Sequence, residues 1–269
     1  WENTEESFNK ILEIEKLIKE NRDIVCHAKT TKEILDAKKN NKVAFIFGFQ
    51  NSAPIANDIF LVEKFFNKGI RFMQLTYNNQ TPLAGGCFEP KDSGVSRFGK
   101  AVIEEMNRLG MLIDISHVSA DTMRDVLQVT RAPVIASHSS AFALHKHPRN
   151  VPDDVLQRLG DNGGVIMVNF YSTFLVGETR TATLHNVLDH IDHIVKVAGM
   201  DHVGLGSDFD GITRVPGQLE DVSMFPYITQ GLIDRGYSDK QILKVLGGNL
   251  LVAFQVTEKA SVSFSDAPS

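Results

Sequence analysis

The sequence is poor in several features that assign proteins to particular classes. Two cysteines, Cys26 and Cys87, stand in 269 residues, and they form neither a CxxC pair nor a disulfide framework. They therefore do not decide the redox compartment. No apolar run approaches the ~18 residues of a membrane span, and no block of like charges occurs in a chain whose net charge is −5. These absences argue against nucleic acid or a membrane as the main partner and favour a small molecule.

Other absences bear on the fold. No glycine-rich phosphate loop follows an apolar run, which argues against a dinucleotide-binding sheet. No repeat, linker or low-complexity segment interrupts the chain. The sequence begins at Trp1 without a signal-peptide pattern, so we expect that something upstream was removed or not included. The localisation, cytoplasmic or exported, stays open for the same reason.

The sequence that remains alternates short apolar runs with amphipathic segments. Apolar runs typical of strands cover residues 23–29, 43–49, 70–76, 111–116, 132–137, 164–170 and 203–208. Helical spacing of apolar residues covers 6–22, 30–40, 100–110, 119–128, 151–163 and 184–199. This order predicts an α/β fold with a parallel sheet, and a ring of strands fits it better than a doubly wound sheet.

Two of the predicted strands stop at a histidine. The run MLIDIS precedes His117, a helix capped by Ser119 follows, and the run APVIAS precedes His138. Side chains at the C-terminal ends of parallel strands gather on one rim, where barrel enzymes have their active sites. A single histidine on an apolar segment is more often structural, but the repetition favours a pair that binds one metal ion or acts in catalysis.

Polar residues end six of the predicted strands: Gln50, Tyr77, His117, His138, Asn169 and Asp208. Imidazoles suit Zn²⁺ or a similar divalent ion. A carboxylate nearby can take a proton from activated water and return it to a leaving group, and Asp208 is the candidate for this role. Its alternative role is to cap the turn DFDG. Together with the histidines, the pattern indicates metal-assisted hydrolysis.

The other histidines are predicted to be structural. His190 and Asp192 form an H-x-D sequence, but residues two apart on a helix point in different directions and cannot chelate one ion. His145 and His147 stand in a loop, where we expect solvated side chains. His27 ends an extended run and is also assigned a structural role. The same expectation holds for the remaining histidines, His185, His193 and His202.

Long ordered segments of this chain resemble a known family. LTYNNQTP, GKAVIEEMNRLGMLIDISHVS, APVIASHSSAFALHKHPRNVPDDVL, GVIMVNFY, DHIDHIVKVAGMDHVGLGSDFDG and GGNLL resemble the renal (membrane) dipeptidases, peptidase family M19, over nearly the whole chain. The resemblance implies a (β/α)8 metallo-barrel, here over residues 1–258 as a single domain lacking its first strand or strands, with a polar tail over 259–269. It also implies one or two zinc ions and hydrolysis of dipeptides.

The resemblance assigns roles to four residues directly. His117 in DISHVS and His138 in ASHSS match the two histidine ligands of one zinc ion. Arg149 in PRNVPDD matches the arginine that binds the substrate carboxylate. Asp208 in GSDFDG matches the catalytic aspartate.

Three positions depart from the family pattern. Gln50 in FGFQNSAP aligns with the bridging glutamate, and a neutral amide oxygen is a weak metal ligand beside a carboxylate. Tyr77 aligns with the substrate-binding histidine, and Phe174 aligns with a tyrosine. The family's H-x-D ligand pair belongs to a first strand that this sequence does not include.

Three functions therefore compete. The first is a zinc-dependent dipeptidase that acts on small dipeptides. The second is a hydrolase of another small amide or a lactam on the same barrel. The third is a catalytically degenerate barrel that binds a ligand, which the substitutions at Gln50 and Tyr77 favour. The sequence does not decide between a monomer and a homodimer.

Overall fold

The computed structural model describes residues 3–265 of the chain, and side-chain burial over residues 3–261. The chain divides into two compact units. Unit 1 comprises Trp1–Ala132 and Phe254–Ser269, and unit 2 comprises Pro133–Ala253. Strands and helices alternate within each unit, as the sequence predicts.

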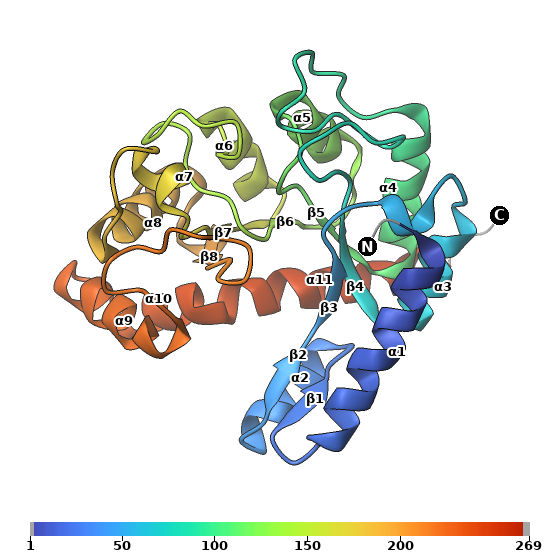
Figure 1. Cartoon of the computed structure of the whole chain (residues 1–269), viewed down its shortest axis with the longest axis horizontal. Helices are drawn as coiled ribbons and strands as arrows, with labels where there is room; N and C mark the ends of the chain where they lie inside the picture. The colour runs from blue at the N-terminus through green and yellow to red at the C-terminus, as the bar shows by residue number, and fades with distance from the viewer. Residues whose placement is uncertain (1–2, 266–269) are drawn as a thin grey trace. The chain divides into compact units, whose positions relative to one another are not determined.

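Unit 1 contains five strands and the helices that follow them (Figure 1). Its strands are β1 (Val25–His27), β2 (Val43–Phe45), β3 (Phe47–Phe49), β4 (Ile70–Gln74) and β5 (Leu112–Asp114). Its helices are α1 (Thr4–Glu20), α2 (Thr31–Lys39), η1 (Ala53–Ile55), α3 (Phe60–Asn67), α4 (Arg97–Leu109) and α5 (Ala120–Val129). Strand β4 pairs in parallel with β3 and β5, whereas β1 and β2 form a separate parallel pair.

Unit 2 repeats this alternation. Its strands are β6 (Val134–Ala136), β7 (Val165–Val168) and β8 (Val203–Leu205), and β7 pairs in parallel with the other two. Its helices are α6 (Asp153–Asp161), α7 (Ser172–Val176), α8 (Leu184–Ala198), η2 (Met200–His202), η3 (Val222–Met224), α9 (Phe225–Asp234), α10 (Asp239–Leu243) and η4 (Lys244–Gly248). Helix α11 (Asn249–Ser265) begins in unit 2, and most of its residues belong to unit 1.

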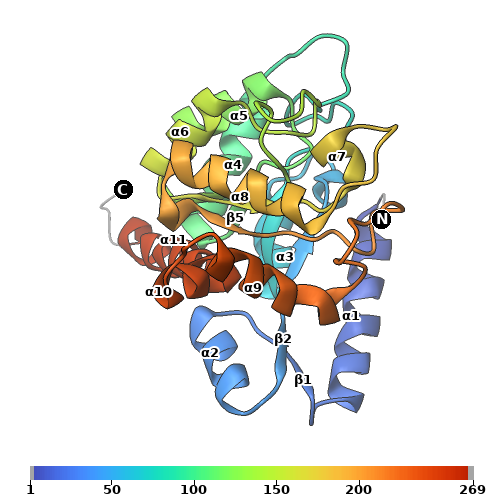
Figure 2. The ribbon, with the colours of Figure 1, turned by 90° about the vertical axis from the view of Figure 1, so that its left-hand side faces the viewer.

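The cores are built as expected for parallel sheets. Every residue of β5, β6 and β7 is buried, as expected for strands covered on both faces, and all of these residues except Asp114 are apolar. In unit 2, α8 lies beside α6 and α9 (Figure 2). The apolar face predicted for residues 184–199 is buried there and includes Val187, Leu188 and Ile191.

Local side-chain chemistry sets the helix starts. Ser119 caps α5 by accepting a hydrogen bond from the Thr122 N–H group, as predicted. Thr30 and Glu33 form a reciprocal capping box at α2, and such caps contribute about 1 kcal/mol each. Glu258 of α11 then accepts hydrogen bonds from the backbone N–H and the hydroxyl group of Thr31, at 3.0 and 2.6 Å, and so ties the start of α2 to α11 within unit 1.

The prediction of one buried strand over residues 43–49 is wrong. The run is divided between β2, which pairs with β1, and β3, which pairs with β4. Val43 and Phe45 are 60% and 47% exposed. The hydrophobicity of a short run favours a buried strand but does not indicate which strands it pairs with. The run therefore does not show whether its residues belong to one sheet or to two.

The predicted domain boundary at residue 258 falls within a helix. Helix α11 continues to Ser265, past the expected end of the barrel at residue 258. The single barrel domain over residues 1–258 stays a prediction. Within the described residues, no helix is both long enough and apolar enough to span a membrane.

Candidate functional site

His117 follows β5 in unit 1 and is held from several sides. Its ring is 6% exposed, its Nδ1 atom lies 2.8 Å from Asn78 Oδ1, and it stacks on Tyr77 with 4.2 Å between ring centroids. Its carbonyl oxygen accepts hydrogen bonds from the Thr76 hydroxyl and the Cys87 N–H group, both at 3.0 Å. These contacts fix the position of the imidazole.

The backbone of His117 is in the left-handed region, at φ 66°. For a residue other than glycine this conformation costs about 1 to 3 kcal/mol, and such strain is concentrated at functional sites. Asn78, at φ 63°, is the hydrogen-bond partner that sequence reasoning missed. The one sequence signal that could have identified Asn78 is its position directly after Tyr77, a residue predicted to end a strand.

Gln50 and Tyr77 are the other two predicted site residues in unit 1. Gln50 directly follows β3 and its side chain is exposed. Tyr77 is 47% exposed, and its ring stacks on that of His117. The structure brings Tyr77 and His117 together.

In unit 2, Arg149 and His138 are in direct contact. Arg149 is 1% exposed, and its Nη2 group donates a hydrogen bond to the His138 carbonyl oxygen at 3.1 Å. Its Nη1 group donates to the Ser139 hydroxyl oxygen at 3.3 Å. The His138 ring is 7% exposed, and its Nδ1 atom lies 2.7 Å from the Ser137 hydroxyl group. The two residues form a buried unit after β6.

Aromatic rings cover the Arg149 side chain. Its guanidinium carbon lies 5.3 Å from the centroid of the Phe174 ring, which also packs on His147 at 4.5 Å. His147 Nδ1 accepts a hydrogen bond from the Arg149 backbone N–H group at 3.1 Å. The pKa of His147 is lowered to about 4. Burial is the main cause, and the charges of Arg149 and His145 contribute less. His147 thus lies in a loop, as predicted, and its side chain is half-buried rather than fully solvated.

Asp208 follows β8 and, like His117, has a left-handed backbone, at φ 62°. Its Oδ2 atom accepts a hydrogen bond from Asn169 Nδ2 at 2.9 Å. The turn DFDG is closed by backbone atoms, because the Gly211 N–H group donates to the Asp208 carbonyl oxygen at 2.9 Å. Among the described residues, the carboxylate forms no hydrogen bond within this turn. This arrangement weighs against the capping role.

His190 and Asp192 do not share a ligand site, as predicted. His190 is 2% exposed, and its Nδ1 atom accepts a hydrogen bond from the Ala141 N–H group at 3.0 Å. Asp192 instead pairs with Arg235 and accepts a hydrogen bond from the Tyr237 hydroxyl group. Both residues of the H-x-D sequence hold unit 2 together.

His190 makes the stability of unit 2 depend on pH. Burial lowers its pKa from 6.5 to about 4. Between about pH 4 and pH 6.5, the unfolded chain therefore binds a proton at His190 that the folded chain does not. The free energy of unfolding should therefore fall as the pH drops below about 6.5, by roughly 2 kcal/mol at about pH 5. Urea denaturation at several pH values measures this. His190→Gln should flatten the dependence, and an unchanged slope in this variant would assign the effect to other groups.

The two predicted metal ligands each have one ring nitrogen engaged with a neighbouring side chain. The Nδ1 atoms of His117 and His138 each lie within hydrogen-bond distance of a neighbouring side chain, an arrangement in which Nε2 would be the metal-binding atom. The residues 3–265 contain no group of three or more His, Cys, Asp or Glu side chains placed to hold a metal ion. Each imidazole by itself thus has one nitrogen engaged with a neighbouring side chain, and the other nitrogen is the atom that could bind a metal ion.

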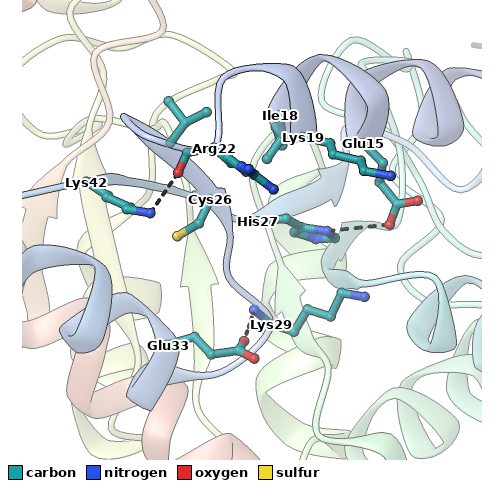
Figure 3. A pocket seen from close by; sticks show the side chains of 10 residues that line it. Glu15, Ile18, Lys19, Arg22, Cys26, His27, Lys29, Glu33 and Lys42 are labelled. Carbon is teal, nitrogen blue, oxygen red and sulfur yellow. Dashed lines mark hydrogen bonds and ion pairs between the residues drawn. The ribbon is translucent and has the colours of Figure 1, made fainter. Parts of the chain in front are cut away.

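A hollow of about 550 Å³ opens in unit 1, lined by α1, β1 and α2 (Figure 3). It contains His27, whose ring stacks on Phe47 with 3.7 Å between centroids and whose Nε2 atom lies 3.3 Å from the Gly69 carbonyl oxygen. Burial is the main cause of the lowered pKa of His27. None of the predicted site residues lines this hollow. The packing of His27 is consistent with the structural role predicted for it.

Comparison with known sequences identifies similar proteins. The family model described as "Membrane dipeptidase (Peptidase family M19)" matches residues 2–267. An uncharacterized dipeptidase of Schizosaccharomyces pombe is 44% identical over 238 residues, which are 85% of this chain and 56% of that protein. The chain therefore spans little more than half the length of this relative.

Comparison with solved structures gives the same result. An amidohydrolase from Pseudomonas aeruginosa has a TM-score of 0.90 at 30% identity, over 96% of this chain and 86% of that one. A metallo peptidase from Rhodobacter sphaeroides, liganded with a phosphinate mimic of the dipeptide L-Ala-D-Ala, has a TM-score of 0.83 at 27% identity, over 88% of this chain and 70% of that one. The α/β barrel class predicted from the sequence is confirmed by these similarities.

Proposed function

We propose, from the premise that this chain belongs to the membrane dipeptidase family, peptidase family M19, that it acts in a metal-dependent dipeptidase that cleaves small dipeptides. The observation that carries the proposal is the buried cluster of unit 2. There Arg149 contacts the His138 carbonyl, and Asn169 contacts both that carbonyl and Asp208. The cluster thus places the Arg149 guanidinium and, through Asn169, the Asp208 carboxylate beside the backbone of His138, whose imidazole is a proposed metal ligand.

Arg149 supports a substrate with a free carboxylate. A guanidinium fork binds a terminal carboxylate through two charge-assisted hydrogen bonds, and an internal peptide bond offers no such group. The burial of Arg149 against Phe174 strengthens this interaction because it lowers the local dielectric. The proposed specificity is therefore for an exopeptidase reaction on short peptides.

His117 and His138 would hold a divalent ion, with Gln50 as a weak additional ligand. Zn²⁺ or a similar ion, when bound, supplies Lewis-acid activation of the peptide carbonyl and of water. Asp208 takes the proton of the attacking water and returns it to the leaving amine. The left-handed backbone at Asp208 and the hydrogen bond from Asn169 hold the carboxylate in one orientation for this transfer.

The proposal is tested with a panel of dipeptides and their C-terminal amides, assayed with and without Zn²⁺. Hydrolysis of the free dipeptides with at least about tenfold preference over the amides is expected, since a lost charge-assisted pair costs about 1.5 to 3 kcal/mol. Equal rates on both series would instead support a hydrolase of other small amides. Tight binding of dipeptides without turnover would support the ligand-binding barrel, the function that the neutral amide at Gln50 favours.

Arg149→Lys tests the carboxylate contact while keeping a buried positive charge. Lysine cannot form the two-pronged contact, so KM for dipeptides should rise about tenfold to a hundredfold at little change in kcat. Steady-state kinetics measures the two parameters separately. A KM equal to that of the wild type would show that another group binds the carboxylate.

Gln50→Glu tests the amide at the end of β3. A carboxylate offers two charged oxygens to a metal ion where the amide offers one neutral oxygen, so the variant should bind Zn²⁺ more tightly. Calorimetric titration of both proteins with Zn²⁺ measures affinity and stoichiometry. Because the wild-type residue is exposed, the substitution should leave the melting temperature unchanged. An unchanged affinity would remove Gln50 from the ligand set.

A further inference from the structure

We propose that Asn169 is a positioning residue that fixes the Asp208 carboxylate, an inference that rests on the proposed catalytic role of Asp208. Asn169 directly follows β7 and is fully buried. Its Nδ2 group donates to Asp208 Oδ2 at 2.9 Å, across 39 residues of sequence. Among the described residues, this is the one hydrogen bond that the carboxylate accepts.

The orientation of the Asn169 amide follows from its surroundings. Its Oδ1 atom accepts a hydrogen bond from the Tyr171 backbone N–H group at 2.6 Å. A flipped amide would direct an NH₂ group at that N–H group and an oxygen at the Asp208 carboxylate, so both contacts would become repulsive. The donor of Asn169 must therefore face Asp208.

Asn169 also connects Asp208 to the histidine and arginine of the cluster. Its Nδ2 group lies 3.4 Å from the His138 carbonyl oxygen, which accepts a hydrogen bond from Arg149 Nη2 at 3.1 Å. The two hydrogens of one amide group can serve the two acceptors. Asn169 thus fixes the distance between the Asp208 carboxylate and the backbone of His138. His138 is a proposed metal ligand, and its carbonyl oxygen contacts Arg149, the proposed substrate-binding residue.

The Asp208 carboxylate needs such a contact because its backbone alone does not fix it. Its left-handed conformation, at φ 62°, is unfavourable for a residue with a side chain and persists only where other contacts hold it. On its other side the carboxylate lies against Gly211, where an added Cβ would stand 2.3 Å from Asp208 Oδ1. The carboxylate is therefore confined between the glycine and the Asn169 amide.

Asn169→Asp is the informative substitution. Aspartate has nearly the same shape and can still accept the hydrogen bond from the Tyr171 N–H group. In its ionised form it cannot donate to Asp208, and it introduces a like charge next to that carboxylate. We expect the Asp208 side chain to leave its position, with a loss of about 10- to 100-fold in kcat and a KM within about threefold of the wild-type value, because Arg149 is unchanged.

The matched control is Asn249→Asp. Asn249 is also a buried asparagine of unit 2, and its Nδ2 group donates to the Met200 and Val203 carbonyl oxygens at 2.9 and 2.8 Å. This variant loses buried amide hydrogen bonds without touching Asp208. It should lower the melting temperature while the Asp208 carboxylate and kcat stay as in the wild type. Asn169→Ser, which is too short to reach Asp208, serves if the Asn169→Asp variant does not fold.

Crystal structures of the three proteins and their kinetics at saturating Zn²⁺ decide the proposal. A displaced or disordered Asp208 carboxylate in the Asn169 variant, with the kcat loss confined to that variant, supports it. A carboxylate in its wild-type position, or an equal kcat loss in the Asn249 control, overturns it. If the wild type hydrolyses no dipeptide, the proposed function fails, and the position of Asp208 in the crystal structures still decides whether Asn169 holds the carboxylate.

Discussion

Asp208→Asn should reduce kcat for dipeptide hydrolysis by about 10²- to 10⁴-fold, which is the range that general acid–base catalysis contributes. The amide cannot accept a proton from water and return it to the leaving amine. KM should change little because Arg149, which binds the substrate carboxylate in the proposed mechanism, is untouched. Steady-state kinetics at saturating Zn²⁺ measures the loss.

The same substitution suits the local structure of Asp208. Asparagine adopts the left-handed region more readily than most residues, and its side-chain oxygen can still accept the hydrogen bond from Asn169. The melting temperature should therefore match that of the wild type, which separates a chemical effect from an effect on folding. Activity within about tenfold of the wild type would exclude Asp208 as the proton-transfer group.

His138→Ala should remove most of the bound metal and nearly all activity. The proposed ligand set is small, so the loss of one imidazole leaves an ion that is held weakly. The deletion also ends the contact between the ring and Ser137 but keeps the carbonyl oxygen that Arg149 and Asn169 use. Metal content after dialysis, measured by mass spectrometry, gives a result that does not depend on activity.

His185→Ala is the control for the metal measurement. His185 stands on α8 in unit 2 with an exposed side chain, and its backbone oxygen accepts a hydrogen bond from Arg235. This variant should retain the metal content of the wild type. Equal metal content in the His138 and His185 variants would mean that His138 is not a ligand and that the repeated strand–histidine pattern is structural.

Much of this fold could be predicted because its signals are local. The apolar runs, the helical spacing of residues 184–199 and the cap at Ser119 depend on residues a few positions apart, and each has its counterpart in the structure. The polar residues His117 and Asp208 could be predicted to follow strands for the same reason, although β5 and β8 end three residues before them, at Asp114 and Leu205. The division of residues 43–49 between two sheets could not be predicted, because an apolar run does not indicate which strands its residues pair with.

The sequence by itself determined which polar residues follow the strands, and only the tertiary structure decided where the strands end and which atoms meet beyond them. The contact between His117 and Asn78 and that between Asp208 and Asn169 each join residues 39 positions apart. The burial of Arg149 also depends on packing against distant rings. Chain segments reach such contacts through the folding of whole strands and helices, so no periodicity or motif reports them. Local chemistry selects the candidates, and long-range packing sets their partners, their exposure and their pKa values.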